Sequence, residues 1–202
     1  TLEEAPDRIV SLTPSNTEIL FELGLDEEVV GVNDNDNYPE QVADKTRIGG
    51  IEYNIETIIS LQPDVVFAHE SSMFTFESAI EQLEASGVTV FVVDNAETFD
   101  ETYETIEVIG TLTGKDEEAD KIIASIQSKL ADIQAKLQGV SPKTAFMVVG
   151  ASPDIYVVGQ NTFMNEMLKE INVDNAVKEE GWPLYSAEQF ITANPDSIVF
   201  TY

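Results

Sequence analysis

The chain carries one histidine, His69, no cysteine and 38 carboxylates, which limits the chemistry that its side chains can perform. No Gly-x-Ser-x-Gly motif is present, and His69 has no recognisable triad spacing. Residues 110–115 (GTLTGK) imitate a phosphate-binding loop but are one residue short and continue with Asp116, so they are more simply a helix end. Carboxylates are too numerous for any pair to be singled out as acid and base. We therefore expect no enzyme.

Two glutamates recur at the same place in a repeated segment. Residues 54–64 (NIETIISLQPD) align without a gap with residues 186–196 (SAEQFITANPD), at an offset of 132. Glu56 and Glu188 each follow a capping residue, Asn54 or Ser186, by two positions, so each falls in a first helical turn. The helix dipole favours a carboxylate there, which explains each glutamate by itself. Their pairing favours a shared function.

A second pair of segments occurs in the same order. Residues 19–29 (ILFELGLDEEV) match residues 167–177 (MLKEINVDNAV) at an offset of 148. Pro-Asp before a strand is ordinary turn chemistry, but that explanation covers one match at a time. Two matches in one order indicate two related lobes.

Short runs of Val, Ile and Phe alternate with longer helical patterns, as in parallel sheets with crossover helices, so the fold class is α/β. The predicted strands of the first lobe are Arg8–Leu12, Val29–Val32, Asp64–His69 and Val88–Val93. Those of the second lobe are Thr144–Val149, Ile155–Val158 and Ser197–Tyr202, fewer than in the first lobe. We expect two Rossmann-like lobes with parallel central sheets, the second one incomplete in this chain.

Three helices are clear from their periodicity. Ser15 and Glu18 form a predicted capping box for a helix over Ser15–Leu23, which Gly24 ends. The longest apolar periodicity spans Asp116–Leu137, and another amphipathic helix runs from about Thr162 to Ile171. The predicted organisation is an N-terminal lobe over 1–112, a bridging helix over 113–139 and a partial C-terminal lobe over 140–202.

The formal net charge of −28 comes from acidic residues spread over the whole chain. Binding to nucleic acid is excluded because phosphate contacts need a lysine and arginine footprint, and charge-driven binding to an anionic membrane surface is disfavoured for the same reason. A solvated acidic surface explains this charge, and attraction of a cationic partner is the alternative. No apolar run is long enough for a membrane span and no leader precedes Thr1, so we expect a soluble chain whose export signal has been removed.

With these motifs the chain resembles the substrate-binding proteins of cobalamin, haem and ferric-siderophore importers, whose two α/β lobes are joined by one rigid helix. The resemblance runs from Arg8 to Tyr202 through RIVSLTPSNTEILFELGL (8–25), the turn Asn37-Tyr38-Pro39, NIETIISLQPDVVFA (54–68), the mid-chain helix and GWPLYSAEQFITANPD (181–196). It implies ligand capture between the lobes in an extracytoplasmic location. It also implies docking onto an ABC permease through Glu56 and Glu188, which would meet arginines of the transporter. A lipid anchor upstream of the given residues is compatible with it.

Within this group, Trp182-Pro183 followed by Ser186 and Glu188 is most similar to the cobalamin-binding proteins, in which a tryptophan lies against the corrin. An exposed Trp suits a flat, bulky ligand, although a core position for the sole Trp is an equal alternative. Asn35 and Gly50 stand where cobalamin proteins can carry aromatic residues. The expected ligand is a corrinoid, with haem or a ferric siderophore as the alternative and a hydrolase or signalling module as a lesser one. No catalytic cofactor is expected.

Ligand sites of open α/β sheets lie at the carboxyl ends of the strands. A lone His69 is more often structural than a ligand of haem iron, and one histidine makes a zinc or manganese cluster improbable. The residues after Asp34 lack the glycine of an EF-hand, so no metal site is expected. The candidate cleft residues are Ser15, Asn16, Tyr38, Gly50, His69, Glu70, Asp94, Tyr156 and Trp182.

Overall fold

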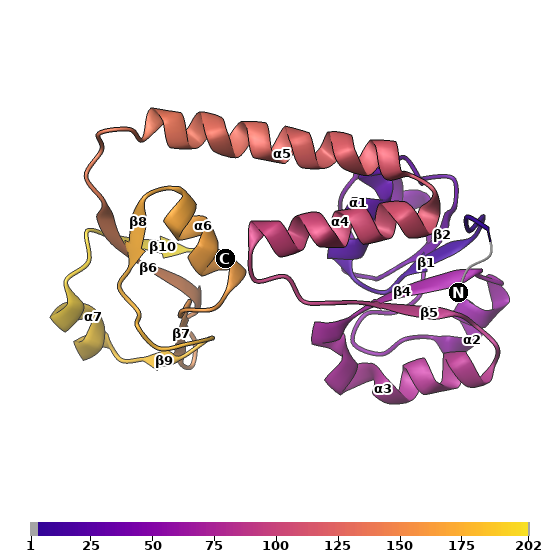
Figure 1. Ribbon diagram of the computed structural model, residues 1–202. Coiled ribbons are helices and arrows are strands. Elements are labelled where there is room, and N and C mark those ends of the chain that lie inside the picture. Colours follow the sequence, from indigo (N-terminus) through magenta and orange to yellow (C-terminus); the bar gives the residue numbers. More distant parts are fainter. Residues whose placement is uncertain (1–3, 202) are drawn as a thin grey trace. The chain divides into compact units, whose positions relative to one another are not determined.

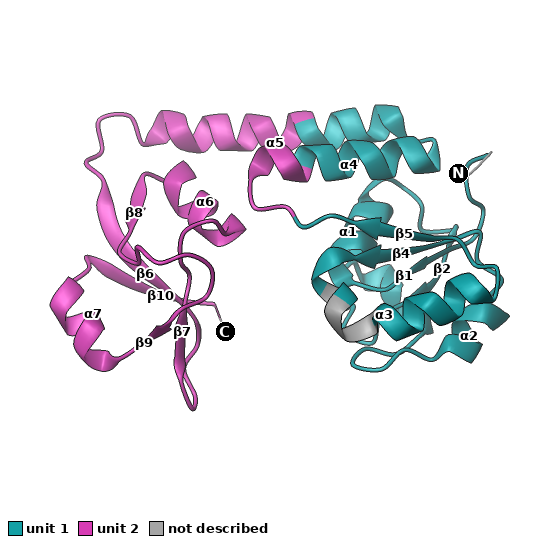
Figure 2. Cartoon of the chain, turned by 60° about the horizontal axis from the view of Figure 1, so that its bottom comes forward, with its two compact units in different colours: residues 1–95, 103–123 teal, residues 96–102, 124–202 magenta. Residues whose placement is uncertain are grey.

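The computed structural model describes residues 4–201, without the side chains of residues 72 and 74–76. Contacts divide the chain into two compact units, the first made of Thr1–Asn95 with Tyr103–Ile123 and the second of Ala96–Thr102 with Ala124–Tyr202 (Figure 2). The division falls inside the mid-chain helix. The boundaries drawn at 112/113 and 139/140 from the sequence remain predictions.

Unit 1 is built on a parallel sheet in the order β3-β2-β1-β4-β5 (Figure 1). Its strands are β1 (Ile9–Ser11), β2 (Val29–Val32), β3 (Thr46–Arg47), β4 (Val65–His69) and β5 (Val90–Val93). The central strands β1 and β4 are almost wholly buried, which explains their continuous apolar sequence. The four predicted strands are confirmed, and β3 is an addition of two residues.

Helices cover both faces of this sheet. They are α1 (Pro14–Glu22), α2 (Ile55–Ser60), α3 (Glu70–Ala85) and α4 (Phe99–Thr113), and a 3-10 turn, η1, spans Glu40–Asp44. Figure 1 shows α2 and α3 on one face, with α1 and α4 on the other. Ile58 of α2 and Leu83 of α3 are fully buried in one apolar cluster with Val10 and Val66 of the sheet.

The start of α1 differs from its prediction. The helix begins at Pro14, and Thr13 is its N-cap residue without a side-chain capping bond, so the capping box of Ser15 and Glu18 is wrong. Proline lacks the N–H that is unsatisfied in a first turn anyway, and its fixed φ suits the first helical position. The helix therefore starts one residue earlier. Gly24, with φ 76°, follows the helix end as expected.

The long mid-chain helix is confirmed as α5 (Asp116–Lys136). The loop that imitates a phosphate-binding motif is the junction between α4 and α5. There Gly114 has φ 70°, and the N–H of Lys115 donates to the carbonyl of Gly110 at 2.7 Å. The interpretation of residues 110–115 as a helix end is confirmed.

Unit 2 contains a sheet in the order β10-β6-β7-β9, with β8 also paired to β6. Its elements are β6 (Lys143–Gly150), β7 (Ile155–Val157), α6 (Phe163–Glu170), β8 (Val173–Asn175), β9 (Leu184–Tyr185), α7 (Ala187–Ala193) and β10 (Ser197–Phe200). Phe146, Val148, Val157 and Val177 form its buried core. The predicted strands and helix are present, although Tyr202 lies outside the described residues.

The sheet of unit 2 is mixed. Strand β10 runs parallel to β6, as expected, and so does β8, which was not predicted. The expected parallel order is wrong for the other two strands, because β7 is antiparallel to β6 and β9 is antiparallel to β7. Only residues 151–154 join β6 to β7, and so short a connection permits an antiparallel pair but no parallel crossover.

Candidate ligand-binding and docking sites

Glu56 and Glu188 occupy the same position in α2 and α7, the second residue of each helix. The Asn54 side chain accepts the N–H of Thr57 at 3.0 Å, and Ser186 Oγ accepts the N–H of Gln189 at 3.3 Å. In α7 the Gln189 side chain also accepts the N–H of Ser186 at 2.8 Å, which completes a capping box. The predicted caps are confirmed, and both glutamates lie exposed in a first turn. Hydrogen bonds from its own N–H and from Ser186 lower the pKa of Glu188.

The C-terminal ends of the two repeated segments, residues 54–64 and 186–196, also match. Gln62 and Asn194 both adopt left-handed backbone, with φ 49° and 44°. Asp64 Oδ2 then accepts the N–H of Arg8, just before β1, at 2.9 Å, and Asp196 Oδ2 accepts that of Thr144, in β6, at 2.8 Å.

Each aspartate thus ties its own strand, β4 or β10, to the parallel neighbour, β1 or β6. In the second pair of segments α1 ends at Glu22 and α6 at Glu170, each followed two residues later by a left-handed residue, Gly24 or Asn172. The predicted internal repeat is confirmed in atomic detail.

A buried polar network holds the carboxyl edge of the unit 1 sheet between β1 and β2. Asp36 is 3% exposed, and its Oδ2 lies 2.9 Å from both Thr17 Oγ1 and the N–H of Asn33. The Asn33 side chain donates to the carbonyl of Leu12 at 2.7 Å, and the Tyr53 hydroxyl donates to the same carbonyl at 2.9 Å. Burial raises the pKa of Asp36, and it raises that of Tyr53 to about 12.

This network fixes the loop that carries Tyr38. The Arg47 guanidinium donates to the carbonyls of Asn33 and Asp36 at 2.7 and 2.9 Å, and Tyr38 projects beyond them, 62% exposed. Gly50 lies beside the same loop, since a Cβ there would be 3.2 Å from Asn35 Nδ2. Tyr38 and Gly50 therefore lie in the same loop region, at the carboxyl edge of the unit 1 sheet.

Tyr38 also lines a cavity of about 310 Å³ that the sequence did not reveal. Its other walls are Glu18, Phe21, Glu22, Asp26, Pro39 and Gln41. The ammonium of Lys45 lies 5.8 Å from the centre of the Phe21 ring.

Three further candidates lie at the neighbouring strand ends. His69 ends β4 and caps α3, and its Nδ1 lies 3.2 Å from the N–H of Ser71. Glu70 Oε2 accepts the N–H of Asn95 at 3.0 Å, which links the loop after β4 to the loop after β5. Asp94 is exposed in that second loop.

Ser15 and Asn16 separate in the first turn of α1. Ser15 is exposed, whereas Asn16 is 1% exposed and its Nδ2 donates to the carbonyl of Ala68 at 2.9 Å. Asn16 therefore joins α1 to β4. Its Oδ1 is buried without a partner among the described residues, so a ligand role for both residues stays a prediction.

In unit 2 Trp182 is 51% exposed, so the core alternative for this residue is wrong. The segment that carries it is fixed by main-chain bonds: the N–H of Gly159 donates to the carbonyl of Gly181 at 2.7 Å, and that of Val157 to Pro183 at 3.1 Å. A Cβ at position 159 would lie 2.4 Å from the Glu179 carbonyl, which explains the glycine. Tyr156, in β7, is partly exposed.

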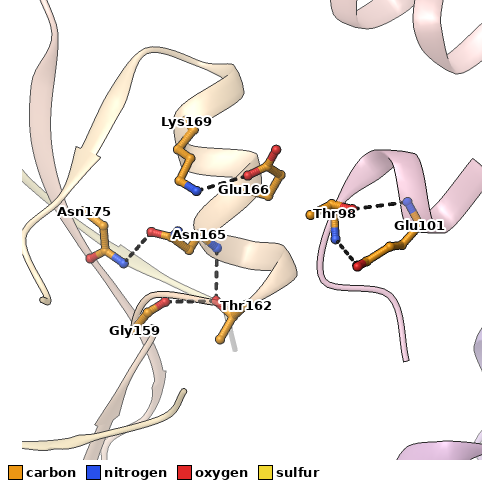
Figure 3. A network of polar contacts seen from close by, with 8 residues as sticks. All are labelled: Thr98, Glu101, Gly159, Thr162, Asn165, Glu166, Lys169 and Asn175. Atoms are coloured by element: carbon orange, nitrogen blue, oxygen red, sulfur yellow. Dashed lines mark hydrogen bonds and ion pairs between the residues drawn. The ribbon is translucent and has the colours of Figure 1, made fainter. Parts of the chain in front are cut away.

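The start of α6 is held by a buried polar network of Thr162, Asn165 and Asn175 (Figure 3). Thr162 Oγ1 donates to the carbonyl of Gly159 at 3.0 Å and accepts the N–H of Asn165 at 3.2 Å. Asn175 Nδ2 donates to Asn165 Oδ1 at 3.1 Å. These bonds connect the loop between β7 and α6 to the start of α6 and to β8, and they favour a rigid position for that loop.

An apolar pocket of about 260 Å³ was also missed by sequence reasoning. Its lining residues are Val148, Ala151, Ile155, Ala187, Phe190, Ile191, Ile198 and Phe200. The apolar run of β10 was its only signal.

Within residues 4–201 no three histidine or carboxylate side chains form a group that could hold a metal ion. No helix among the same residues combines the length and apolar character of a membrane span.

Comparison with known proteins gives these sites a context. Over its whole length the chain is 45% identical to the uncharacterized ABC transporter substrate-binding lipoprotein YvrC of Bacillus subtilis, of which it spans 65%. It is 28% identical, again over its whole length, to the vitamin B12-binding protein of Photorhabdus laumondii, of which it spans 73%. A crystal structure of a possible iron-binding (periplasmic solute-binding) protein from Staphylococcus epidermidis shares 35% identity and a TM-score of 0.90, covering 98% of this chain and 78% of the other.

Residues 9–202 match the family described as periplasmic binding protein. This match covers nearly the same residues as the resemblance, which runs from Arg8 to Tyr202. The family name also agrees with the extracytoplasmic location that the resemblance implies. The chain therefore belongs to the periplasmic binding protein family.

Proposed function

We propose that this chain is the larger part of a receptor that captures a corrinoid outside the cytoplasm and delivers it to an ABC permease. The matched pair of Glu56 and Glu188 carries the proposal, because two equivalent carboxylates on two related units suit a partner that contacts both. The names of the relatives, an ABC transporter lipoprotein and a vitamin B12-binding protein, support it. A lipid anchor upstream of the given residues is part of the proposal.

The exposed side chains of unit 2 support a flat, bulky ligand. Trp182 and Leu184 are each about half exposed on the same short segment. An aromatic ring supplies contact area with little loss of rotamer freedom, so Trp182 is suited to lie against a corrin. We also assign Tyr38, Gly50, His69, Glu70, Asp94 and Tyr156 to ligand contact.

The arginines argue against a strongly anionic siderophore. The chain has two at positions 8 and 47, and both are engaged by main-chain carbonyls. Arg8 Nε donates to Leu61 at 2.7 Å, and the Arg47 guanidinium donates to Asn33 and Asp36. Both guanidinium groups already make main-chain hydrogen bonds, which disfavours their use for a ligand carboxylate or catecholate.

Haem or a ferric siderophore is the second candidate. The Staphylococcus epidermidis protein, described as possibly iron-binding, favours this alternative. Absorbance distinguishes the two, because corrinoids and haem have different visible spectra. We expect the purified chain to bind cyanocobalamin in calorimetric titration. Binding of haem without cyanocobalamin would replace the lead ligand, and binding of neither would remove both.

The docking role is tested in proteoliposomes that contain the permease. Glu56→Ala with Glu188→Ala is expected to abolish uptake and to leave ligand affinity unchanged, since the carboxylates are proposed to meet transporter arginines through charge-assisted hydrogen bonds. Glu117→Ala is the matched control, because Glu117 is exposed at the second position of α5 and lies outside the repeat. Uptake that survives the double substitution would contradict the docking assignment.

A further inference from the structure

The single histidine is held in one orientation by the helix that follows it. His69 is the N-cap residue of α3, with Nδ1 3.2 Å from the backbone nitrogen of Ser71 and 2.8 Å from Ser71 Oγ. A backbone N–H can only donate, so Nδ1 must accept this bond and carries no proton.

The proton of a neutral imidazole then lies on the other nitrogen, because the hydrogen bond of one ring nitrogen sets the state of the other. Burial lowers the pKa of His69 below its usual value, against the opposing effects of Glu70 and Asp94, and so favours the neutral ring. In the described part of the chain, Nε2 has no hydrogen-bond partner. His69 ends β4, at the sheet edge where open α/β sheets bind ligands.

We infer that His69 presents Nε2–H to an acceptor oxygen of the ligand and does not coordinate iron. Coordination needs an unprotonated nitrogen with a free lone pair. The lone pair of Nδ1 is engaged by the α3 cap, and Nε2 carries the proton. This inference rests on the proposed function and refines its ligand, since a corrin displays many amide carbonyls at its periphery that can accept such a bond.

The tautomer can be read directly, without any ligand. The chain has one histidine, so a long-range 1H–15N spectrum of a protein without a histidine tag contains one imidazole. At pH 8 we expect the pattern of a neutral ring protonated at Nε2. The pattern of the Nδ1–H tautomer would overturn the inference.

Ligand titration tests the consequence. His69→Asn removes the imidazole but keeps a side chain that can cap α3, so we expect the fold to be retained. Haem added to wild type and to His69→Asn is expected to give the same absorbance spectrum. A band of histidine-ligated haem that only the wild type shows would overturn the inference.

Cyanocobalamin is expected to bind His69→Asn roughly three- to tenfold more weakly, as the loss of one hydrogen bond implies. Unchanged affinity would remove the donor role. Should wild type bind neither ligand, the proposed function fails together with the donor role, while the 15N spectrum still decides the tautomer.

Discussion

The chain contains two copies of one helix-strand repeat: α2 with β4, and α7 with β10. The strands of the two copies lie in different environments. Both have a capped helix, a glutamate at its second position, a left-handed residue and an aspartate that binds the neighbouring strand. Yet β4 is almost wholly buried, while every residue of β10 is exposed. Strand β4 lies between β1 and β5, whereas β10 pairs with β6 alone within the described residues.

This difference in burial shows which features depend on the repeated segment itself and which depend on the elements packed around it. Hydrogen bonds of the caps and of the aspartate form within the segment and its nearest strand, so both copies make them. Burial depends on other elements, and β10 has no second neighbouring strand in the part of the chain that the structure describes. Exposed apolar groups of this kind are typical of surfaces that make contacts with other elements or proteins.

Replacing a phenylalanine by alanine in each strand should give the largest difference in unfolding free energy between β4 and β10. Phe67 in β4 is fully buried, and Phe200 in β10 is 58% exposed. Phe67→Ala is expected to lower the free energy of unfolding by about 3–5 kcal/mol, because it removes a buried ring and leaves a cavity. Phe200→Ala should cost less than about 2 kcal/mol, since much of the ring already contacts water. Urea denaturation followed by circular dichroism measures both values, and equal losses would contradict the contrast.

Caps should behave alike in the two copies. Asn54→Ala and Ser186→Ala each remove one acceptor for a first-turn N–H, so each is expected to cost about 1 kcal/mol of unfolding free energy. Asn54→Ser and Ser186→Asn exchange the two caps and should be nearly neutral. A large cost for one cap only would show that the copies differ locally as well as in burial.

Glycine substitutions at the two left-handed residues, Gln62 and Asn194, should change the free energy of unfolding by slightly different amounts. Gln62 has a side chain that disfavours φ 49°, so Gln62→Gly is expected to raise the free energy of unfolding by up to about 1 kcal/mol. Asn194→Gly should change it by less than about 0.5 kcal/mol, because asparagine tolerates this conformation. Thermal unfolding of the two variants checks whether Gln62→Gly stabilises the protein more than Asn194→Gly does. A stabilising effect of Asn194→Gly alone would contradict this order.

The last prediction concerns pH. The N–H of Thr144, with Lys143 and the Thr144 hydroxyl, lowers the pKa of Asp196. A depressed pKa means that the unfolded state binds more protons, so this stabilisation is present above the unfolded pKa and is lost as pH falls through the folded value. Asp196→Asn should therefore be less stable than wild type at pH 7, with the difference shrinking below about pH 4. A difference that persists unchanged in acid would rule out this linkage.

Much of the fold and repeat could be predicted because the signals are local. Asn54 and Ser186 cap their helices as expected, and the periodicity of residues 116–137 gave α5 nearly to its ends. Short strands such as β3 and β9 escaped because two residues carry no periodicity. Thr13 replaced Ser15 as a cap because Pro14 is suited to the first helical position.

The candidate site was predictable only in outline. That Tyr38, Gly50 and His69 follow strands could be read from the sequence, but the separation of exposed Ser15 from buried Asn16 depends on which face of α1 meets β4. The protonation of His69 likewise depends on the Ser71 N–H, which reaches Nδ1 only when α3 forms.

The sequence alone determined two related α/β units, their caps, and the glutamates at matched positions, because hydrogen bonds within a few residues specify these features. Only the tertiary structure decided that Trp182 is exposed, that both arginines are engaged by main-chain carbonyls, and that β10 is exposed where β4 is buried. Those outcomes depend on contacts between residues far apart along the chain, which local patterns do not specify.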